Sequence, residues 1–350
     1  MSTFFYHLTP DIVLQSIEKS GLEPTGHCMA LNSYENRVYD LRLEDGTHVV
    51  AKFYRPGRWS KEQIHEEHAF LFDLQENEIP VCAPLHFDDG VTLHEINGIY
   101  YAIWPRTGGR ATDEFSDSQL QTLGRLLARI HNVGAVKSIS RRIELTGTNY
   151  GTIPLAFLEE NNFIPDHCRP RYHNAVNEIV DIYDSLRKDV PFLKIHGDCH
   201  HGNLLLGNDG WFFLDFDDFL SGPAVQDVWM LVPARDRDGL RKRELFLEAY
   251  RQFREFDPSW LRLIEPLRAL RYIRYAAWIA KRWSDPAFPA AFPHFGTDQY
   301  WEDETDDLED QLKFYSSSTQ DMTRTVTGPG QTSEEEAELT NSDFFWDWED

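Results

Sequence analysis

The spacing of apolar residues changes once along this chain, and that change constrains the fold more than any other feature. In the first hundred residues the pattern is that of strands: Val38–Leu43 and Thr47–Tyr54 flank Asp45-Gly46, a dipeptide typical of a tight hairpin. A second hairpin turns at Asn97-Gly98, and one helical pattern, Ser60–Leu74, lies between the two hairpins. The sequence therefore predicts a small sheet with one main helix.

Helical spacing replaces this pattern after Asp117. Apolar residues three and four positions apart predict helices over 120–131, 175–186, 240–253 and 261–283, with one stretch of strand and turn at 193–219. Two glycines loosen the chain at 106–113, where we place a lobe boundary. The sequence predicts an α+β, bilobal fold, with a small β-rich N-lobe at 1–105 that contains one main helix, and a larger helical C-lobe at 106–315.

The charge of the chain excludes some classes of partner. The 350 residues include 34 Lys and Arg against 58 Asp and Glu, a formal net charge of −24. A protein that neutralises nucleic-acid phosphates needs a basic face, so we expect no nucleic-acid partner. No apolar run approaches the roughly 18 residues that cross a bilayer, and no leader-like segment begins the chain, so we expect no membrane partner and a cytoplasmic location. We also expect a monomer.

The C-terminal region carries more than half of the charge imbalance. Residues 301–350 contain 16 acidic and 2 basic residues. Ser, Thr, Gly and Pro dominate 316–331, and the final segment adds four aromatic residues to its acids. We predict an acidic, disordered tail over 316–350, which is either only solvated or a short segment that binds a partner or inhibits the protein. The basic residues along 262–282 are interpreted as a helix surface, or as a docking face for an acidic substrate or for this tail.

The chemistry concentrates in residues 196–227. His196, Asp198 and Asn203 form H-x-D-x4-N, and Asp215 follows in an apolar strand. A loop followed by a tight hairpin can gather two carboxylates and an amide oxygen around one small space, and Mg²⁺ prefers such oxygen ligands. Phosphoryl transfer also needs a lysine for the nucleotide phosphates, held by a glutamate on a helix. Lys52, within a strand, and Glu67, on the main helix, supply that pair.

These motifs resemble the kinase-like phosphotransferases of the aminoglycoside phosphotransferase and choline kinase group. The group has an HGD-x-H-x-GN loop and then an I/L-D-x-x-D strand, which match His196–Asn203 and Leu214–Asp218. The segments LNSYENRVY (31–39), VAKFYRPGRW (50–59) and GPAVQDVWML (222–231) more closely resemble a bacterial protein kinase of this fold. The resemblance covers residues 5–315. It implies a protein-kinase-like fold, ATP and Mg²⁺ as cofactors, and transfer of phosphate to a protein Ser or Thr hydroxyl.

The resemblance also implies roles for individual residues. Asp198 would be the catalytic base, Asn203 and Asp215 the Mg²⁺ ligands, and Lys52 the residue on the nucleotide phosphates; Asp215 thus serves both catalysis and metal binding. Glu67, rather than Glu66, would hold Lys52, because the apolar positions that follow it match those of related phosphotransferases. Two further roles are implied: Ser33 lies near the nucleotide phosphates, and Asp227 braces the catalytic loop.

The sequence departs from protein kinases of the eukaryotic type in three ways. Gly197 stands where those kinases have an arginine, and Gln226 comes eleven residues after Asp215, which leaves no room for a long activation segment. The phosphate-covering glycines are absent between Leu31 and Val38. We infer constitutive activity, or control by something other than loop phosphorylation.

Three alternatives remain open at this point. The acceptor could be a small amino alcohol, aminoglycoside or sugar, with acids in the helical lobe attracting a cationic substrate. The chain could also be a nucleotide-binding regulator without turnover. The third alternative is a zinc site made by His196, Cys199, His200 and His201, although adjacent ligands cannot easily surround one tetrahedral ion.

Overall fold

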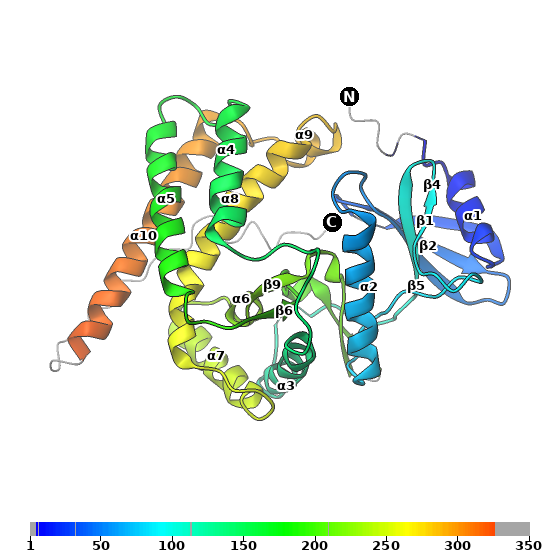
Figure 1. Ribbon diagram of the computed structural model, residues 1–350, viewed down its shortest axis with the longest axis horizontal. Coiled ribbons are helices and arrows are strands. Elements are labelled where there is room, and N and C mark those ends of the chain that lie inside the picture. The colour runs from blue at the N-terminus through cyan, green and yellow to red at the C-terminus, as the bar shows by residue number, and fades with distance from the viewer. Residues whose placement is uncertain (1–4, 6, 32, 113, 209, 326–350) are drawn as a thin grey trace. The chain divides into compact units, whose positions relative to one another are not determined.

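The computed structural model describes residues 5, 7–31, 33–112, 114–208 and 210–325. An antiparallel sheet of five strands occupies the N-terminal part, in the order β1-β2-β3-β5-β4 (Figure 1). Its strands are β1 (Pro24–Leu31), β2 (Arg37–Leu43), β3 (His48–Phe53), β4 (His94–Ile96) and β5 (Ile99–Pro105). Both predicted hairpins are present: β2 pairs with β3 around Asp45-Gly46, and β4 pairs with β5 around Asn97-Gly98.

Two helices cover the two faces of this sheet. Val13 and Ile17 of α1 (Pro10–Lys19) pack into a core with Phe53 and other odd-numbered residues of β3 and β5. Ile64 of α2 (Lys61–Glu76) packs on the opposite face. Because side chains alternate along a strand, Lys52 lies on the face that α2 covers.

Local sequence explains where α2 begins and which side of it is buried. The Ser60 hydroxyl oxygen accepts a hydrogen bond from the backbone N–H of Gln63, and the Gln63 side-chain oxygen accepts one from the backbone N–H of Ser60, which is a capping box. The buried side of the helix then includes Glu67 and His68 among its apolar residues. A carboxylate and an imidazole are thereby placed in the interior, beside the sheet.

Short strands and turns follow in the middle of the chain. β6 (Phe192–Ile195) pairs with β9 (Leu220–Pro223), and β7 (Leu204–Gly207) pairs with β8 (Gly210–Phe213). Single-turn helices at His201–Asn203 and Phe216–Asp218 lie in the connections. The remaining α-helices of the described residues are α3 (Asp117–Gly134), α4 (Ile153–Glu160), α5 (Arg169–Leu186), α6 (Val225–Leu231), α7 (Arg237–Tyr250), α8 (Ile264–Arg282), α9 (Ala287–Ala291) and α10 (Asp298–Thr325).

The chain divides into two compact units that are interleaved in sequence. The first comprises 1–145, 187–264 and 284–291, and the second comprises 146–186, 265–283 and 292–350. The first unit holds the five-stranded sheet and the short strands, and the second holds α4, α5, α10 and nearly all of α8. The predicted lobes at 1–105 and 106–315 were drawn where the sequence pattern changes from strands to helices, not by compactness. They stay a prediction.

The α+β fold class is confirmed, and one predicted boundary needs correction. The segment 316–325 was expected to belong to a disordered tail, but it continues α10 through Thr325. Near the start of this helix, Trp301, Thr305 and Leu308 are buried at helical spacing. The helix therefore has a side that packs against the protein, although the stretch is strongly acidic. The rest of the predicted tail, 326–350, lies outside the described residues. Among the helices of the described part, none is long and apolar enough to span a membrane.

Candidate active site

A buried carboxylate holds the loop that follows β6. Asp227, in the first turn of α6, accepts hydrogen bonds from the backbone N–H groups of His196 (2.8 Å) and Gly197 (2.9 Å). His131 Nε2 lies 3.1 Å from the same carboxylate, and neither side chain is exposed. The Nε2 atom of His196 lies 2.8 Å from the carbonyl oxygen of Leu214. The predicted bracing of this loop by Asp227 is confirmed, and the His196 ring also helps to hold the loop.

Gly197 can be only glycine in this loop. Its φ of +82° lies in the left-handed region, and a Cβ atom would come 2.5 Å from the backbone oxygen of Asp218. The close approach fastens the loop to the segment that follows β8. An arginine at this position, as in eukaryotic-type kinases, would not fit.

Asn203 comes directly before β7, and Asp215 follows shortly after the end of β8, so the two residues lie close together. The N–H of Leu214 donates to the carbonyl oxygen of Asn203 (2.9 Å), which brings Asp215 beside it. Asn203 Nδ2 donates to the carbonyl oxygen of Asp198 (2.9 Å), so the amide oxygen of Asn203 points away from that bond. The segments that carry Asp198, Asn203 and Asp215 are thus connected by one side-chain and one main-chain hydrogen bond.

Asp215 has an unusual backbone conformation. Its φ and ψ are 54° and 66°, in the left-handed region. Such a conformation costs a residue with a Cβ atom about 1–3 kcal/mol and is kept only where the surrounding structure determines it. The turn directs a carboxylate that is 56% exposed toward Lys52, whose Nζ lies 3.0 Å away.

Lys52 lies among three carboxylates. Its Nζ is 3.0 Å from Asp215, 3.1 Å from Asp217 and 3.8 Å from Glu67. The structure therefore brings the predicted pair of Lys52 and Glu67 together, at the long end of ion-pair distances. The other Glu67 oxygen accepts a hydrogen bond from Arg142 (2.9 Å).

Glu66 points elsewhere. Its carboxylate accepts hydrogen bonds from the backbone N–H groups of Ser140, Arg141 and Arg142 at 2.5–2.9 Å. It thus fastens α2 to the segment that follows α3. Of the two neighbouring glutamates, Glu67 is the one beside Lys52, as the sequence analysis had it.

Burial and charge decide how these groups titrate. Burial alone would lower the pKa of Lys52, but Asp215, Asp217 and Glu67 reverse that effect and raise it. Burial would likewise raise the pKa of Asp217, but Arg58, and after it Lys52, holds it below the ordinary range. Burial raises the pKa of Glu67 to about 7, although Lys52 opposes this. Of the two buried carboxylates, Asp217 at 3.1 Å is therefore a firmer counter-ion of Lys52 than Glu67 at 3.8 Å.

Comparison with known proteins places this site in a family. The model of the phosphotransferase enzyme family named APH matches residues 27–264, which is more than half of the chain. The chain belongs to the APH phosphotransferase family. It is 39% identical over 310 residues to stress response kinase A of Escherichia coli K12, and the match covers 88% of this chain and 94% of that protein. Serine/threonine protein kinase RdoA of Salmonella typhimurium matches with the same identity and coverage. The chain is a phosphotransferase with a hydroxyl group as acceptor.

Solved structures of phosphotransferases have the same fold. Amicoumacin kinase hAmiN, in complex with AMP-PNP, Ca²⁺ and Ami, superposes with a TM-score of 0.66 at 23% identity and covers 83% of this chain and 93% of that chain. Spectinomycin phosphotransferase APH(9)-Ia superposes with a TM-score of 0.62 at 16% identity and covers 86% and 97%. At these identities the likeness concerns the fold, and it confirms the bilobal, kinase-like class.

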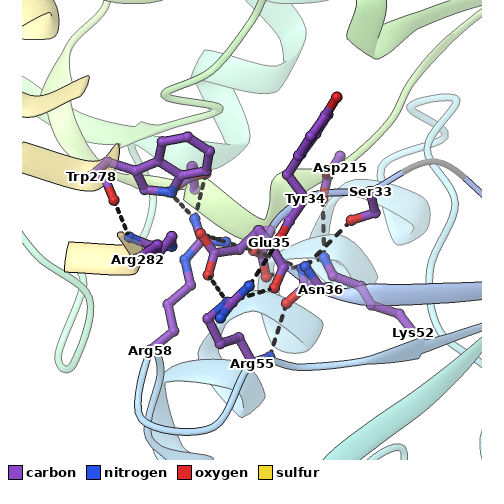
Figure 2. Close-up of polar contacts among 12 residues, drawn as sticks. Ser33, Tyr34, Glu35, Asn36, Lys52, Arg55, Arg58, Asp215, Trp278 and Arg282 are labelled. Atoms are coloured by element: carbon purple, nitrogen blue, oxygen red, sulfur yellow. Dashed lines mark hydrogen bonds and ion pairs between the residues drawn. The ribbon is translucent and has the colours of Figure 1, made fainter. Parts of the chain in front are cut away.

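In this phosphotransferase the glycine-free loop between β1 and β2 is held by side chains. Asn36 donates to Asp217 (3.2 Å) and accepts from the backbone N–H of Arg55 (3.1 Å). Arg55 donates to the carbonyl oxygens of Tyr34 (3.1 Å) and Glu35 (3.0 Å), as Figure 2 shows. The loop is therefore fixed at three successive residues without any glycine.

Ser33, the residue proposed to lie near the nucleotide phosphates, is at the start of the same loop. Its hydroxyl oxygen accepts a hydrogen bond from the backbone N–H of Asn36 (3.3 Å), which closes a short turn (Figure 2). Because Asn36 also contacts Asp217, Ser33 is connected to the segment after β8 by two hydrogen bonds.

Arg58 is the main residue that sequence reasoning missed. Its guanidinium contacts Asp217 (2.5 Å) and both carboxylate oxygens of Asp218 (2.7 Å). Arg58 lies within the motif VAKFYRPGRW, but nothing in this motif indicates that its partners lie about 160 positions later in the sequence.

The zinc alternative finds no support in the structure. Within the described ranges, no group of three or more His, Cys, Asp or Glu side chains is placed to hold a metal ion. His196 and His201 both lie within hydrogen-bond distance of backbone carbonyl oxygens. A binding site for Mg²⁺ made by one carboxylate and one amide is a different arrangement, because that ion completes its shell with water and phosphate oxygens.

We expect Gly197→Ala to destabilise the protein more than Gly90→Ala. Both glycines have a φ of +82°, but a Cβ atom at Gly90 meets nothing within 4 Å. The difference in the free energy of unfolding, measured by urea denaturation, isolates the clash with the Asp218 backbone from the shared backbone strain. We expect it to exceed about 1 kcal/mol, the lower end of overpacking costs. Equal losses in the two variants would mean that the loop moves without penalty.

His68 makes stability depend on acidity. Its ring nitrogens lie 3.1 Å from Tyr54 Oη and 2.8 Å from Thr92 Oγ1, and burial lowers its pKa to about 3. An unfolded histidine titrates near 6.5. The stabilisation by neutral His68 is therefore complete above pH 6.5 and is lost as the pH falls toward 3, at up to about 1.4 kcal/mol per pH unit.

Replacement of His68 by Gln should make the free energy of unfolding less dependent on pH between 6.5 and 4. The matched control is His167→Gln, because the His167 side chain is 51% exposed. Urea denaturation at each pH measures the slope. An unchanged slope in His68→Gln would show that other groups cause the acid sensitivity.

Proposed function

We propose that this phosphotransferase is an ATP- and Mg²⁺-dependent serine/threonine protein kinase that acts in a bacterial stress response. The observation that carries the proposal is the 39% identity with stress response kinase A over 88% of the chain. Lys52, Asp198, Asn203 and Asp215 are all present and all lie in the first compact unit. A regulator without turnover commonly lacks one of them.

Asp198 is proposed as the group that orients the acceptor hydroxyl and takes its proton. It lies in a loop whose backbone is fixed at His196 and Gly197 by Asp227. In phosphoryl transfer, most of the catalysis comes from positioning and from electrostatic stabilisation. A rigid loop therefore serves this role better than a mobile one.

Asn203 and Asp215 are proposed to hold Mg²⁺. The amide nitrogen of Asn203 is committed to the Asp198 carbonyl oxygen, so the amide oxygen remains for a cation. The carboxylate of Asp215 is 56% exposed, which is accessible enough for a ligand shared with water and phosphate. This donor set fits a hard cation. When bound, the ion would neutralise charge that develops on the phosphate oxygens.

Lys52, Glu67 and Ser33 are proposed to bind the nucleotide. Lys52 would hold the α- and β-phosphates, with Glu67 and Asp217 keeping its ammonium group in place. Ser33 and the backbone N–H groups of its loop would take the part that glycines play in other kinases. The hydrogen bonds of Asn36 and Arg55 support this, since they keep the loop in one conformation.

The proposal includes a protein acceptor, a monomeric state and a cytoplasmic location. It also places the nucleotide on residues 1–105 and the acceptor on residues 106–315. The name of the curated relative RdoA, a serine/threonine protein kinase, supports a protein acceptor.

Replacement of Asp198 by Asn should abolish transfer while Mg-ATP still binds. The amide cannot accept the hydroxyl proton, and loss of a general base typically costs about 10²–10⁴-fold in rate. Purified full-length protein is incubated with γ-labelled ATP, Mg²⁺ and a generic protein acceptor, and label on Ser or Thr is quantified. Asp238→Asn, an exposed change of the same kind, is the control.

The outcomes separate the alternatives. Labelled protein with the wild type and the control, but not with Asp198→Asn, supports the proposal. Label that appears only in a small amino alcohol, aminoglycoside or sugar moves the acceptor to that class. ATP binding without transfer to any acceptor would contradict an enzymatic role.

Arg58→Ala should lower kcat/KM for ATP about 10- to 100-fold. The substitution leaves Asp217 and Asp218 without their guanidinium partner, so Asp217 no longer fixes Lys52 and Asn36 as firmly. The KM for ATP should rise together with the fall in kcat, because both the lysine and the nucleotide loop are displaced. Arg42→Ala, on an exposed position of β2, is the matched control. Unchanged kinetics in Arg58→Ala would remove Arg58 from the site.

A further inference from the structure

One side of α8 combines basic and aromatic side chains. Positions 271, 274, 275, 278, 281 and 282 follow the i, i+3, i+4, i+7 spacing of a single helix face. We call this the α8 basic face; it consists of Arg271, Arg274, Tyr275, Trp278, Lys281 and Arg282. The rings of Tyr275 and Trp278 stack with centroids 5.5 Å apart, and the Arg282 guanidinium lies 4.9 Å from the Trp278 ring. All six residues belong to the second compact unit.

Two of these cations, Arg274 and Lys281, lie beside aromatic rings and beside no carboxylate of the described residues. Arg274 lies 4.2 Å from the centre of the Tyr150 ring, and Lys281 lies 5.2 Å from that of Phe157. Neither forms an ion pair with a carboxylate in the part of the chain that the structure describes. Burial lowers the pKa of Lys281, and the charges of Arg274 and Arg282 lower it further. In a protein of net charge −24, these mutually repelling cations attract an anionic partner.

The C-terminal segment of the same chain has the complementary composition. Residues 332–350 contain eight acidic residues, no basic residue and four aromatic residues, namely Phe344, Phe345, Trp346 and Trp348. Acids can pair with Arg274 and Lys281, and rings can pack beside Tyr275 and Trp278. We propose that residues 332–350 dock on the α8 basic face of their own chain.

The segment is long enough to reach this face. Gln311, Leu312 and Tyr315 of α10 line a small pocket together with Glu265, Pro266 and Ala269 of α8, so the two helices are close there. At 1.5 Å per residue, α10 continues about 15 Å beyond Tyr315, and Lys281 lies about 18 Å along α8 from Ala269. The 25 residues from 326 to 350 span up to about 80 Å when extended.

Because residues 332–350 are covalently connected to α8, weak contacts are sufficient to keep them docked. A short flexible connection gives an effective concentration of about 1 mM. A segment with a dissociation constant of about 0.1 mM as a free peptide would then be docked in roughly nine molecules of ten. The docked segment is a built-in competitor for any other acidic ligand of this face.

Carbodiimide cross-linking of the full-length protein tests the proposal. The carbodiimide activates a Glu or Asp carboxylate, Lys281 Nζ attacks it, and an amide forms while the reagent leaves as a urea. Mass spectrometry should find Lys281 joined to carboxylates between Glu334 and Asp350. Lys313, on α10 and nearer to the segment in sequence, is the internal control for a segment that is merely tethered.

We expect the yield with Lys281 to be at least that with Lys313, and to fall about fivefold or more in Arg274→Glu/Arg282→Glu. Arg262→Glu, outside the α8 basic face, should leave the yield unchanged. High salt should lower the yield, since the Debye length falls to about 3 Å at 1 M.

Three results would overturn the proposal. The first is linkage of the segment to Lys313 but not to Lys281. The second is a yield with Lys281 that survives Arg274→Glu/Arg282→Glu. The third, in a mixture of unlabelled and ¹⁵N-labelled protein, is linkage found only between chains, which would assign the face to a second copy.

Discussion

A single buried carboxylate, Asp217, connects the parts of the candidate active site. Its oxygens contact Lys52 from β3, Arg58 from the loop before α2 and Asn36 from the loop before β2. Asp217 follows Asp215, whose left-handed conformation needs such support. Breaking a buried ion pair on one side typically costs about 3–5 kcal/mol. The orientation of Lys52, of the loop between β1 and β2 and of the proposed metal ligand Asp215 thus depends on the same charge.

Much of this arrangement could be predicted because its signals are local. Asp45-Gly46 and Asn97-Gly98 determine two hairpins, and strand alternation then places Lys52 on one face of the sheet. Helical spacing places Glu67 on the buried side of α2. The choice of Glu67 over Glu66 as the partner of Lys52 rested on the resemblance to related phosphotransferases, and the structure places the Glu67 carboxylate 3.8 Å from Lys52 Nζ.

The rest depends on long side chains that cross between distant segments. Arg142 reaches Glu67, 75 positions away, and no periodicity or turn signal indicates such a partner. β1 was missed for another reason: it is a largely exposed edge strand without alternating burial, and its register shifts between Pro24 and Cys28. The end of α10 was missed because helical packing sites are sparse in an acidic stretch, which reads as a solvated tail.

The interleaved order of the two units has a consequence for synthesis. The first unit draws on residues 1–145, 187–264 and 284–291, and segments of the second unit separate these parts. A chain that leaves the ribosome from its N-terminus cannot complete the first unit until residue 291 has emerged. Residue 291 lies about five sixths of the way along the 350 residues. The sheet with Lys52 must therefore wait for Asp198, Asp215 and Asp217 before its buried cations find their partners, which makes early nascent chains natural clients for chaperones.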